Sequence, residues 1–150
     1  MKKKKIVVVS GGFDPVHIGH LRMFKESKKL GDELVVVINN DNWLKSKKGY
    51  SFMPEKDRLE LISAFSCVDR VFLTNHKKDD LDDSVCKALL KIKPDIFANG
   101  GDRKADNIPE YDLCNRLGIK LVFNVGGKKI RSSSELVKIS KVSSKKDKRK

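Results

Sequence analysis

The sequence predicts a single α/β domain built on a doubly wound parallel sheet. Two observations lead to this fold class: short β-branched runs alternate with helical patterns along the chain, and glycines mark several of the junctions between them. The chain has 150 residues and 39% hydrophobic content, which is enough for one core but hardly for two. In such sheets ligands bind beyond the carboxyl ends of the strands, so we look for function there.

The first elements form a strand, helix, strand unit. Ile6–Val9 is a β-branched run that ends at a pair of glycines, as a buried parallel strand would. Apolar residues at a spacing of three over 18–24 predict a helix, and Gly31 is expected to end it. Glu33–Asn39 carries five consecutive aliphatic residues and predicts the second buried strand.

The rest of the chain continues the alternation. The polar, lysine-rich segment Asn40–Met53 is expected to be a loop before a helix opened by Pro54. The further expected elements are a strand Val68–Thr74, a helix Leu81–Ile92, a strand Ile96–Ala98, a helix Ile108–Leu117 ended by Gly118, a strand Lys120–Phe123 and a short helix Ser133–Ser140. Together they predict a five-stranded, Rossmann-like parallel sheet.

The formal net charge of +13 is concentrated at the two ends of the chain. Lys2–Lys5 is entirely basic, and Lys141–Lys150 is rich in lysine and serine without apolar periodicity. We therefore expect a domain over residues 1–140 and a basic, disordered tail over 141–150. The moderate excess that remains in the domain suits a protein that handles phosphates, and nucleic acid is not the expected partner.

Cysteine usage and hydropathy predict a cytoplasmic protein. The three cysteines, Cys67, Cys86 and Cys114, are far apart and form no Cys-x-x-Cys pair, so neither a disulfide framework nor a zinc knuckle is predicted. No apolar run approaches the length of a membrane span, and the start lacks the long apolar region of a secretory signal.

The most informative segment, Gly11–His20, lies where the first strand meets the first helix. Gly11 and Gly12 are expected to let the backbone turn and approach a ligand, while the helix that follows points its positive end the same way. His17 and His20 are three residues apart and share one face of the first turn, and Gly19 between them is expected to leave room for a bulky ligand. This pattern predicts a phosphate site with two imidazoles that stabilise charge in a transition state.

Other functions fit the same segment less well. A Walker A loop and a dinucleotide fingerprint are excluded, because neither Gly-Lys-Ser/Thr nor three spaced glycines follow the first strand. A zinc site would need a third ligand at a suitable spacing, which the sequence does not suggest, so no metal ligand is predicted. Histidines that only cap the helix would leave the adjacent glycines unexplained.

The segment Gly12–His20 resembles the signature of the cytidylyltransferase-like nucleotidyltransferases, small α/β enzymes with a His-x-Gly-His motif. Three further segments resemble family motifs in family order: Leu44-Lys45 followed by Pro54–Arg58, Asn99–Asp102, and Ile130–Ser134. The resemblance extends from Ile6 to about residue 140, which is nearly the whole chain.

The resemblance implies a reaction in which an acceptor phosphate attacks the α-phosphate of a nucleoside triphosphate and releases pyrophosphate. Such chemistry requires positioning and charge screening by cations, backbone donors and Mg²⁺. It also implies a homodimer. By the match, the catalytic residues would be His17, His20, Lys45 and Arg58; the nucleotide-binding residues would be Gly11, Gly12, Phe13, Asp14, Gly19, Gly100, Asp102, Arg131, Ser132, Ser133 and Ser134.

The substrates are less well determined by these motifs. The length and the lysine loop resemble the glycerol 3-phosphate branch, which favours CTP with a sugar- or polyol-phosphate. Gly100-Gly101-Asp102 is closer to the heptose-phosphate branch, and ATP with such an acceptor is the alternative. Lys45 is the preferred functional lysine, with Lys47 and Lys48 left open. A hypothesis of another class is a non-catalytic polyanion-binding module that uses the basic termini.

Overall fold

The fold is a five-stranded sheet with the strand order β3-β2-β1-β4-β5, in which every neighbouring pair is parallel. The computed structural model describes residues 3–100, 108–126 and 136–138. Its strands are β1 Ile6–Gly11, β2 Glu33–Ile38, β3 Arg70–Leu73, β4 Ile96–Gly100 and β5 Lys120–Val125. The predicted fold class and all five strands are confirmed.

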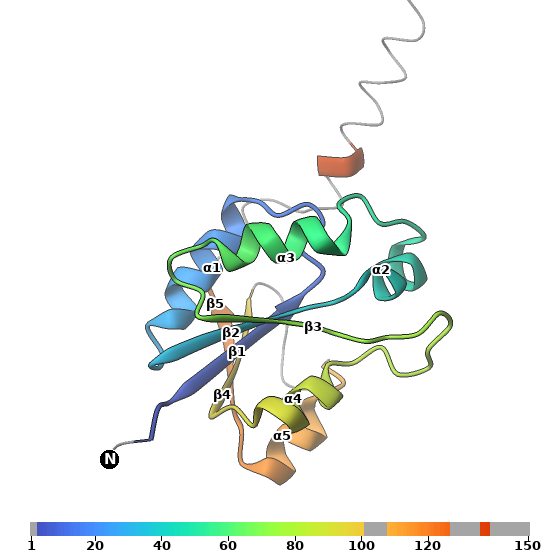
Figure 1. Cartoon of the computed structure of the whole chain (residues 1–150). Helices are drawn as coiled ribbons and strands as arrows, with labels where there is room; N and C mark the ends of the chain where they lie inside the picture. Colours follow the sequence, from blue (N-terminus) through green and yellow to red (C-terminus); the bar gives the residue numbers. More distant parts are fainter. Residues whose placement is uncertain (1–2, 101–107, 127–135, 139–150) are drawn as a thin grey trace, which may run out of the picture.

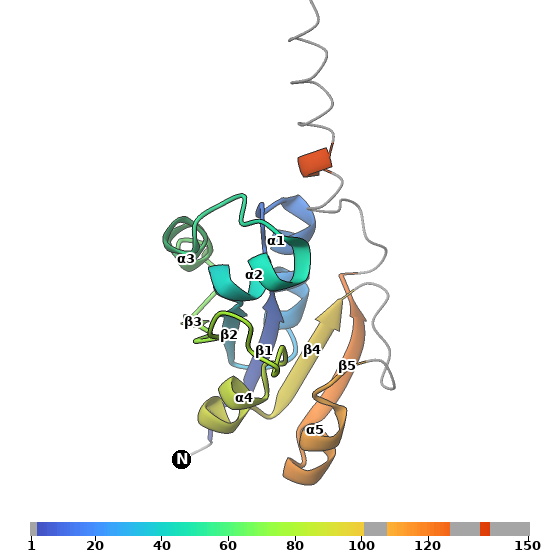
Figure 2. The same ribbon diagram turned by 90° about the vertical axis from the view of Figure 1, so that its right-hand side faces the viewer.

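The helices cover both faces of this sheet. They are α1 Ile18–Lys28, α2 Asp41–Lys48, α3 Glu55–Ser63, α4 Cys86–Ile92 and α5 Tyr111–Leu117. Helices α1 and α3 lie on one face and α4 and α5 on the other, while α2 lies past the carboxyl end of β2 (Figures 1 and 2). Among the described residues, no helix is long and apolar enough to cross a bilayer.

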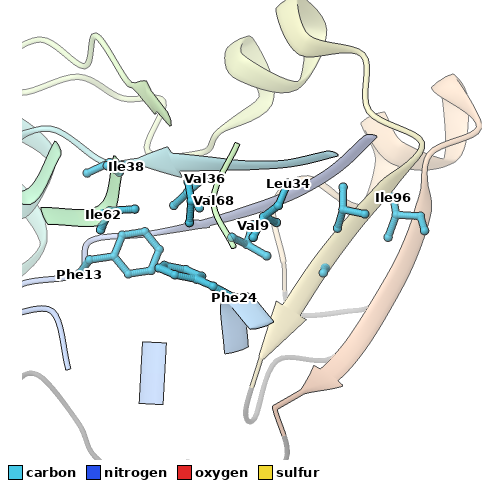
Figure 3. Packing of buried hydrophobic residues seen from close by; sticks show 11 residues of the cluster. Val9, Phe13, Phe24, Leu34, Val36, Ile38, Ile62, Val68 and Ile96 are labelled. Atoms are coloured by element: carbon cyan, nitrogen blue, oxygen red, sulfur yellow. The ribbon is translucent and has the colours of Figure 1, made fainter. Parts of the chain in front are cut away.

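Alternating side chains of the strands build two cores. On β1, Val7 and Val9 point into the core under α1 and α3, whereas Val8 points into the core under α4 and α5. Figure 3 shows the first of these, where the rings of Phe13 and Phe24 lie beside aliphatic side chains of the strands. Because the central strand is buried on both faces, its run of valines is continuous rather than alternating.

The segment expected to be a loop over Asn40–Met53 contains the helix α2, so that prediction was wrong. Asn40 accepts a hydrogen bond from the Trp43 amide and begins the helix, and Gly49, with φ of 82°, ends it. These are ordinary helix start and stop signals, but the strongly polar composition hid them. Leu44, which is fully buried, packs this polar helix against Gly12, just after β1.

Two of the other predicted helices begin later than expected. Helix α4 starts at Cys86 and not at Leu81, which is fully exposed. Asp80, Asp82 and Ser84 accept hydrogen bonds from nearby backbone amides, and such local bonds compete with helix formation. The expected helix Ile108–Leu117 likewise begins only at Tyr111.

Gly31 does not end the first helix by a left-handed conformation. A Cβ at this position would lie 2.7 Å from the backbone oxygen of Lys5, so the glycine is needed for close approach of two backbones. The proposed tail over 141–150 lies outside the described residues, as do most residues of the expected helix Ser133–Ser140.

Candidate active site

The candidate site is centred on the turn between β1 and α1, at the carboxyl edge of the sheet. A Cβ on Gly11 would lie 2.9 Å from the ring of Phe13, and one on Gly12 would lie 2.9 Å from Leu44 Cδ2. Both glycines are therefore required for packing. The left-handed residue of the turn is Phe13, with φ of 53°, and neither glycine has a positive φ.

His17 and His20 are stacked, with ring centroids 3.8 Å apart and an angle of 24° between the ring planes. His17 Nδ1 accepts a hydrogen bond from the Gly19 amide at 3.1 Å, and His20 Nδ1 accepts one from the His17 amide at 3.2 Å. Because both Nδ1 atoms are acceptors, the neutral rings carry their hydrogen on Nε2. The first turn of α1 thus presents two N–H donors turned away from the backbone amides.

Gly19 is the residue that permits this arrangement. A Cβ there would lie 2.9 Å from Cε1 of His17. The His17 ring occupies that space when it caps the helix, and any side chain at position 19 would push it away. The sequence analysis expected this room to admit a ligand, but the imidazole of His17 occupies it.

Phe13 and Asp14 are buried residues that shape the turn. The Phe13 ring makes edge contacts with His20 and Phe24, at centroid distances of 4.9 and 5.3 Å. The carboxylate of Asp14 is fully buried and accepts hydrogen bonds from the amides of Phe52 at 2.6 Å and of Met53. Their side chains therefore position the β1–α1 turn and the 49–54 loop, while a nucleotide could contact only their backbone.

Arg58 lies at the centre of a buried hydrogen-bond network. Its side chain is 0% exposed. Its guanidinium donates to one carboxylate and three backbone carbonyls: Asp41 Oδ1 at 2.8 Å, Gly12 O at 2.7 Å, Asn39 O at 2.5 Å and Met53 O at 3.0 Å. This placement does not offer the direct phosphate contact expected from the sequence, and it does not form the surface pair with Glu55 that was the alternative. Arg58 instead joins four segments that end at the site.

Asp41 is a partner of Arg58 that the sequence analysis did not single out. Its pKa lies below the usual aspartate value: burial raises the pKa, but hydrogen bonds from Ser51 and Arg58 and the Arg58 charge outweigh that effect. The carboxylate is therefore charged at neutral pH and balances the buried guanidinium. The signal that could have identified it is the Asn-Asp pair directly after a buried strand, which begins a helix.

The three candidate lysines lie on different sides of α2. Lys47 forms an ion pair with Asp83, so it faces the β3–α4 loop. Lys48 is half-buried and lies one turn after Leu44, the residue that packs on Gly12. Lys45 directly follows Leu44, so its side chain points more than a quarter-turn around the helix from that face; it is exposed and makes no ion pair with any described residue. The ion pair with Asp83 occupies Lys47, and of the other two lysines Lys48 lies closer to the face that carries Leu44.

Gly100 ends β4, on the other side of β1 from α2. A Cβ there would lie 2.7 Å from the sulfur of Met23, which belongs to α1, so the glycine keeps β4 and α1 close together. Asp102, Arg131, Ser132, Ser133 and Ser134 lie outside the described residues. The structure therefore brings together the β1–α1 turn, α2 and the carboxyl ends of β2 and β4.

The three cysteines are free thiols; Cys67 and Cys86 are partly buried and Cys114 is buried. Burial raises the pKa of all three thiols, and that of Cys114 reaches about 11. Within residues 3–100, 108–126 and 136–138 no group of three or more His, Cys, Asp or Glu side chains could hold a metal ion.

The arrangement is suited to binding an anion. The amino end of α1 contributes the positive end of its dipole and two imidazole donors, and α2 brings lysines to the same edge of the sheet. Parallel strands, helices on both faces and an anion site after β1 define the class of α/β nucleotide-binding proteins.

Comparison with known proteins identifies the family. The model of the cytidylyltransferase-like family matches residues 8–142, and the chain belongs to this family. It is an enzyme of the nucleotidyltransferase type. The resemblance stated from the motifs is thereby confirmed.

The similar proteins include FAD synthases and bifunctional HldE proteins. The chain is 41% identical to an FAD synthase from Thermoplasma volcanium, with 75% of each chain covered. It is 35% identical to the bifunctional protein HldE from Desulfatibacillum aliphaticivorans, over 80% of this chain but only 24% of that protein. Among solved structures, the lipopolysaccharide core biosynthesis protein from T. volcanium matches with a TM-score of 0.67 and 34% identity, covering 81% of this chain and 97% of that one.

Proposed function

We propose that this enzyme is an adenylyltransferase. A phosphate oxygen of an acceptor attacks the α-phosphorus of ATP, a new P–O bond forms, and the bond to the leaving pyrophosphate breaks. The observation that carries this proposal is the pair of stacked imidazoles at the start of α1, whose Nδ1 atoms are held by backbone amides. Their Nε2–H groups can donate to the α-phosphate, where charge grows in the transition state.

The relatives support ATP as the nucleotide. The product of an FAD synthase is FAD, in which an adenylate is joined to FMN. Several similar proteins from different archaea carry the name FAD synthase. This favours the alternative weighed in the sequence analysis, ATP, over CTP with glycerol 3-phosphate. FMN is accordingly our first acceptor, and a heptose-phosphate-like sugar phosphate is the second.

The other residues take roles that follow from their positions or, outside the described residues, from their motifs. Lys45 supplies positive charge to the acceptor phosphate or the triphosphate, with Lys48 as the neighbouring candidate on α2. Gly11, Gly12 and Gly100 allow the close packing that shapes the nucleotide site around the β1–α1 turn and the end of β4. Asp102 lines the nucleoside pocket, and Arg131 with Ser132, Ser133 and Ser134 binds the β- and γ-phosphates, as their motifs suggest.

Asp14 and Arg58 are positioning residues in this proposal. Asp14 fixes the 49–54 loop to the β1–α1 turn, and Arg58 ties that turn to the start of α2. Enzymes of this type generally use a divalent metal with the nucleotide. We propose that Mg²⁺ enters the site bound to ATP, as part of the substrate. We also retain a homodimer and a cytoplasmic location as predictions.

The test is pyrophosphate release from ATP, CTP, GTP and UTP, each with Mg²⁺ and with FMN, heptose 1-phosphate or glycerol 3-phosphate. We expect turnover with ATP and FMN, and loss of that turnover in His20→Ala. Turnover with CTP alone would overturn the adenylyltransferase proposal, and absence of nucleotide binding would overturn catalysis. Light scattering of the eluting protein would test the homodimer.

A further inference from the structure

The chain contains a single tryptophan, and the structure fixes it beside the candidate active site. Trp43 belongs to the first turn of α2. Its indole Nε1 donates to the carbonyl of Asp83 at 2.7 Å, and a Cβ on Gly12 would lie 3.3 Å from its Cζ3. The indole thus extends from the β1–α1 turn to the β3–α4 loop.

Both ends of this indole are immobilised. The backbone of Asp83 holds the pyrrole edge, and the side chain of Asp83 forms an ion pair with Lys47 one turn further along α2. The six-membered ring has the β1–α1 turn next to it, where only a glycine leaves enough space. The side chain nevertheless remains only half-buried.

What Trp43 can still offer to a ligand is an apolar surface. An indole has one polar atom, the Nε1–H group, and Asp83 already accepts its hydrogen. A sugar needs hydrogen-bond partners for its hydroxyl groups, which the indole cannot supply. A flat aromatic ring gains from stacking on a rigid indole face and loses little entropy there.

The position of Trp43 associates it with the acceptor and not with the nucleoside. Helix α2 follows β2, which lies on one side of β1, whereas Gly100 ends β4 on the other side. In the proposed function the nucleoside lies on the β4 side and its α-phosphate at the imidazoles. The acceptor must then approach from the β2 side, next to Gly12 and Trp43.

We propose that Trp43 is a specificity-determining residue that stacks on the aromatic ring system of the acceptor. The acceptor is then a phosphorylated aromatic heterocycle, with a flavin ring as the probe of choice, and not a sugar phosphate. This inference rests on the proposed function, because it deepens the assignment of the acceptor at the same site.

The experiment is a titration of the full chain with FMN, followed by flavin fluorescence. Indole stacked on a flavin quenches its emission, so we expect strong quenching in the wild type. Trp43→Phe retains an aromatic face that is a poor quencher, so FMN should still bind but remain fluorescent. Trp43→Leu should weaken FMN binding by about 5- to 150-fold, the range of one lost stacking contact.

Steady-state kinetics provide a second readout. In Trp43→Leu the KM for FMN should rise while the KM for ATP and kcat stay close to the wild type, and Trp43→Phe should restore the KM for FMN. Tyr111→Leu is the matched control, because it removes a partly exposed aromatic ring from α5, on the far face of the sheet. Circular dichroism verifies that each variant is folded.

Several outcomes would overturn the inference. Unchanged FMN affinity in folded Trp43→Leu, or unquenched FMN bound to the wild type, would exclude stacking. A rise in the KM for ATP alone would assign Trp43 to the adenine. Turnover of ATP with sugar phosphates and none with FMN would refute the inference while the adenylyltransferase proposal stands. If FMN binds and Trp43 quenches its fluorescence but no pyrophosphate is released, stacking on Trp43 is supported and the proposed reaction is refuted.

Discussion

Replacing Arg58 by methionine tests whether this arginine holds the site together. The substitution keeps an unbranched side chain of similar length but removes the donors to Gly12, Asn39, Met53 and Asp41. Asp41 would remain a partly buried carboxylate whose guanidinium partner is gone. The β1–α1 turn would lose its connection to the start of α2.

The magnitude follows from the burial of the pair. Removing one partner of a buried ion pair costs about 3 to 5 kcal/mol, since the other charge stays behind without compensation. Domains of this size are stable by about 5 to 15 kcal/mol, so Arg58→Met should remain folded but approach the threshold. Arg58→Lys keeps the charge but cannot serve all four acceptors, and it should lose less.

The assay is urea unfolding of Arg58→Met, Asp41→Asn and the double variant. We expect a coupling energy of at least about 1 kcal/mol, because the two side chains share a hydrogen bond and an ion pair. A loss of stability below about 1 kcal/mol in Arg58→Met, or strictly additive single effects, would refute the reasoning. Arg58 would then be better explained as a residue that moves to contact phosphate.

Three further predictions concern separate parts of the molecule. His17→Asn should keep an acceptor for the helix cap and fold within about 1 kcal/mol of the wild type, yet its turnover should fall about 10²- to 10³-fold. The turnover of His20→Ala should fall by a similar factor. A loss of unfolding free energy as large as the loss of transition-state stabilisation calculated from kcat would contradict this. Gly12→Ala should cost about 1 to 3 kcal/mol and raise the KM for the acceptor, because the new methyl group meets Leu44; a wild-type unfolding curve would count against that packing. Cys114, with its pKa raised to about 11 and its side chain buried, should resist iodoacetamide at pH 7 until the protein is unfolded, which peptide mass spectrometry can follow.

Acid unfolding should reflect the lowered pKa of Asp41. The folded-state pKa lies below the unfolded value, so the stabilisation is complete above the unfolded pKa and is lost as the pH falls through the folded one. In Asp41→Asn this part of the acid dependence is expected to disappear.

The fold was predictable because its signals are local. The buried strands are β-branched runs between turns. The helix start is formed by the short segment His17–His20 itself, in which the two histidine side chains bond nearby backbone amides. Such patterns depend on a few consecutive residues, so reading them requires no knowledge of distant contacts. Gly118 is a further example, because its left-handed conformation ends α5 as a glycine after a helix should.

The role of Arg58 was not predictable for the opposite reason. Its acceptors belong to residues 5, 17, 19 and 46 positions away along the chain. Each acceptor except Asp41 is a backbone carbonyl, which every residue has, so no side-chain pattern announces the network. The same limit explains Gly31, whose function depends on the backbone of Lys5.

The histidine pair shows why a structural role and a chemical role need not compete. One hypothesis from the sequence was that His17 and His20 only cap the helix, and they do cap it, since each Nδ1 accepts a backbone hydrogen. That bond also decides which ring nitrogen carries the hydrogen, and it leaves Nε2 as the donor in both rings. The cap therefore orients the very atoms that the proposed reaction uses. Asparagine can accept the same backbone hydrogen through its oxygen, but its shorter side chain places no donor where Nε2 lies. Replacing His17 by asparagine therefore separates the two roles.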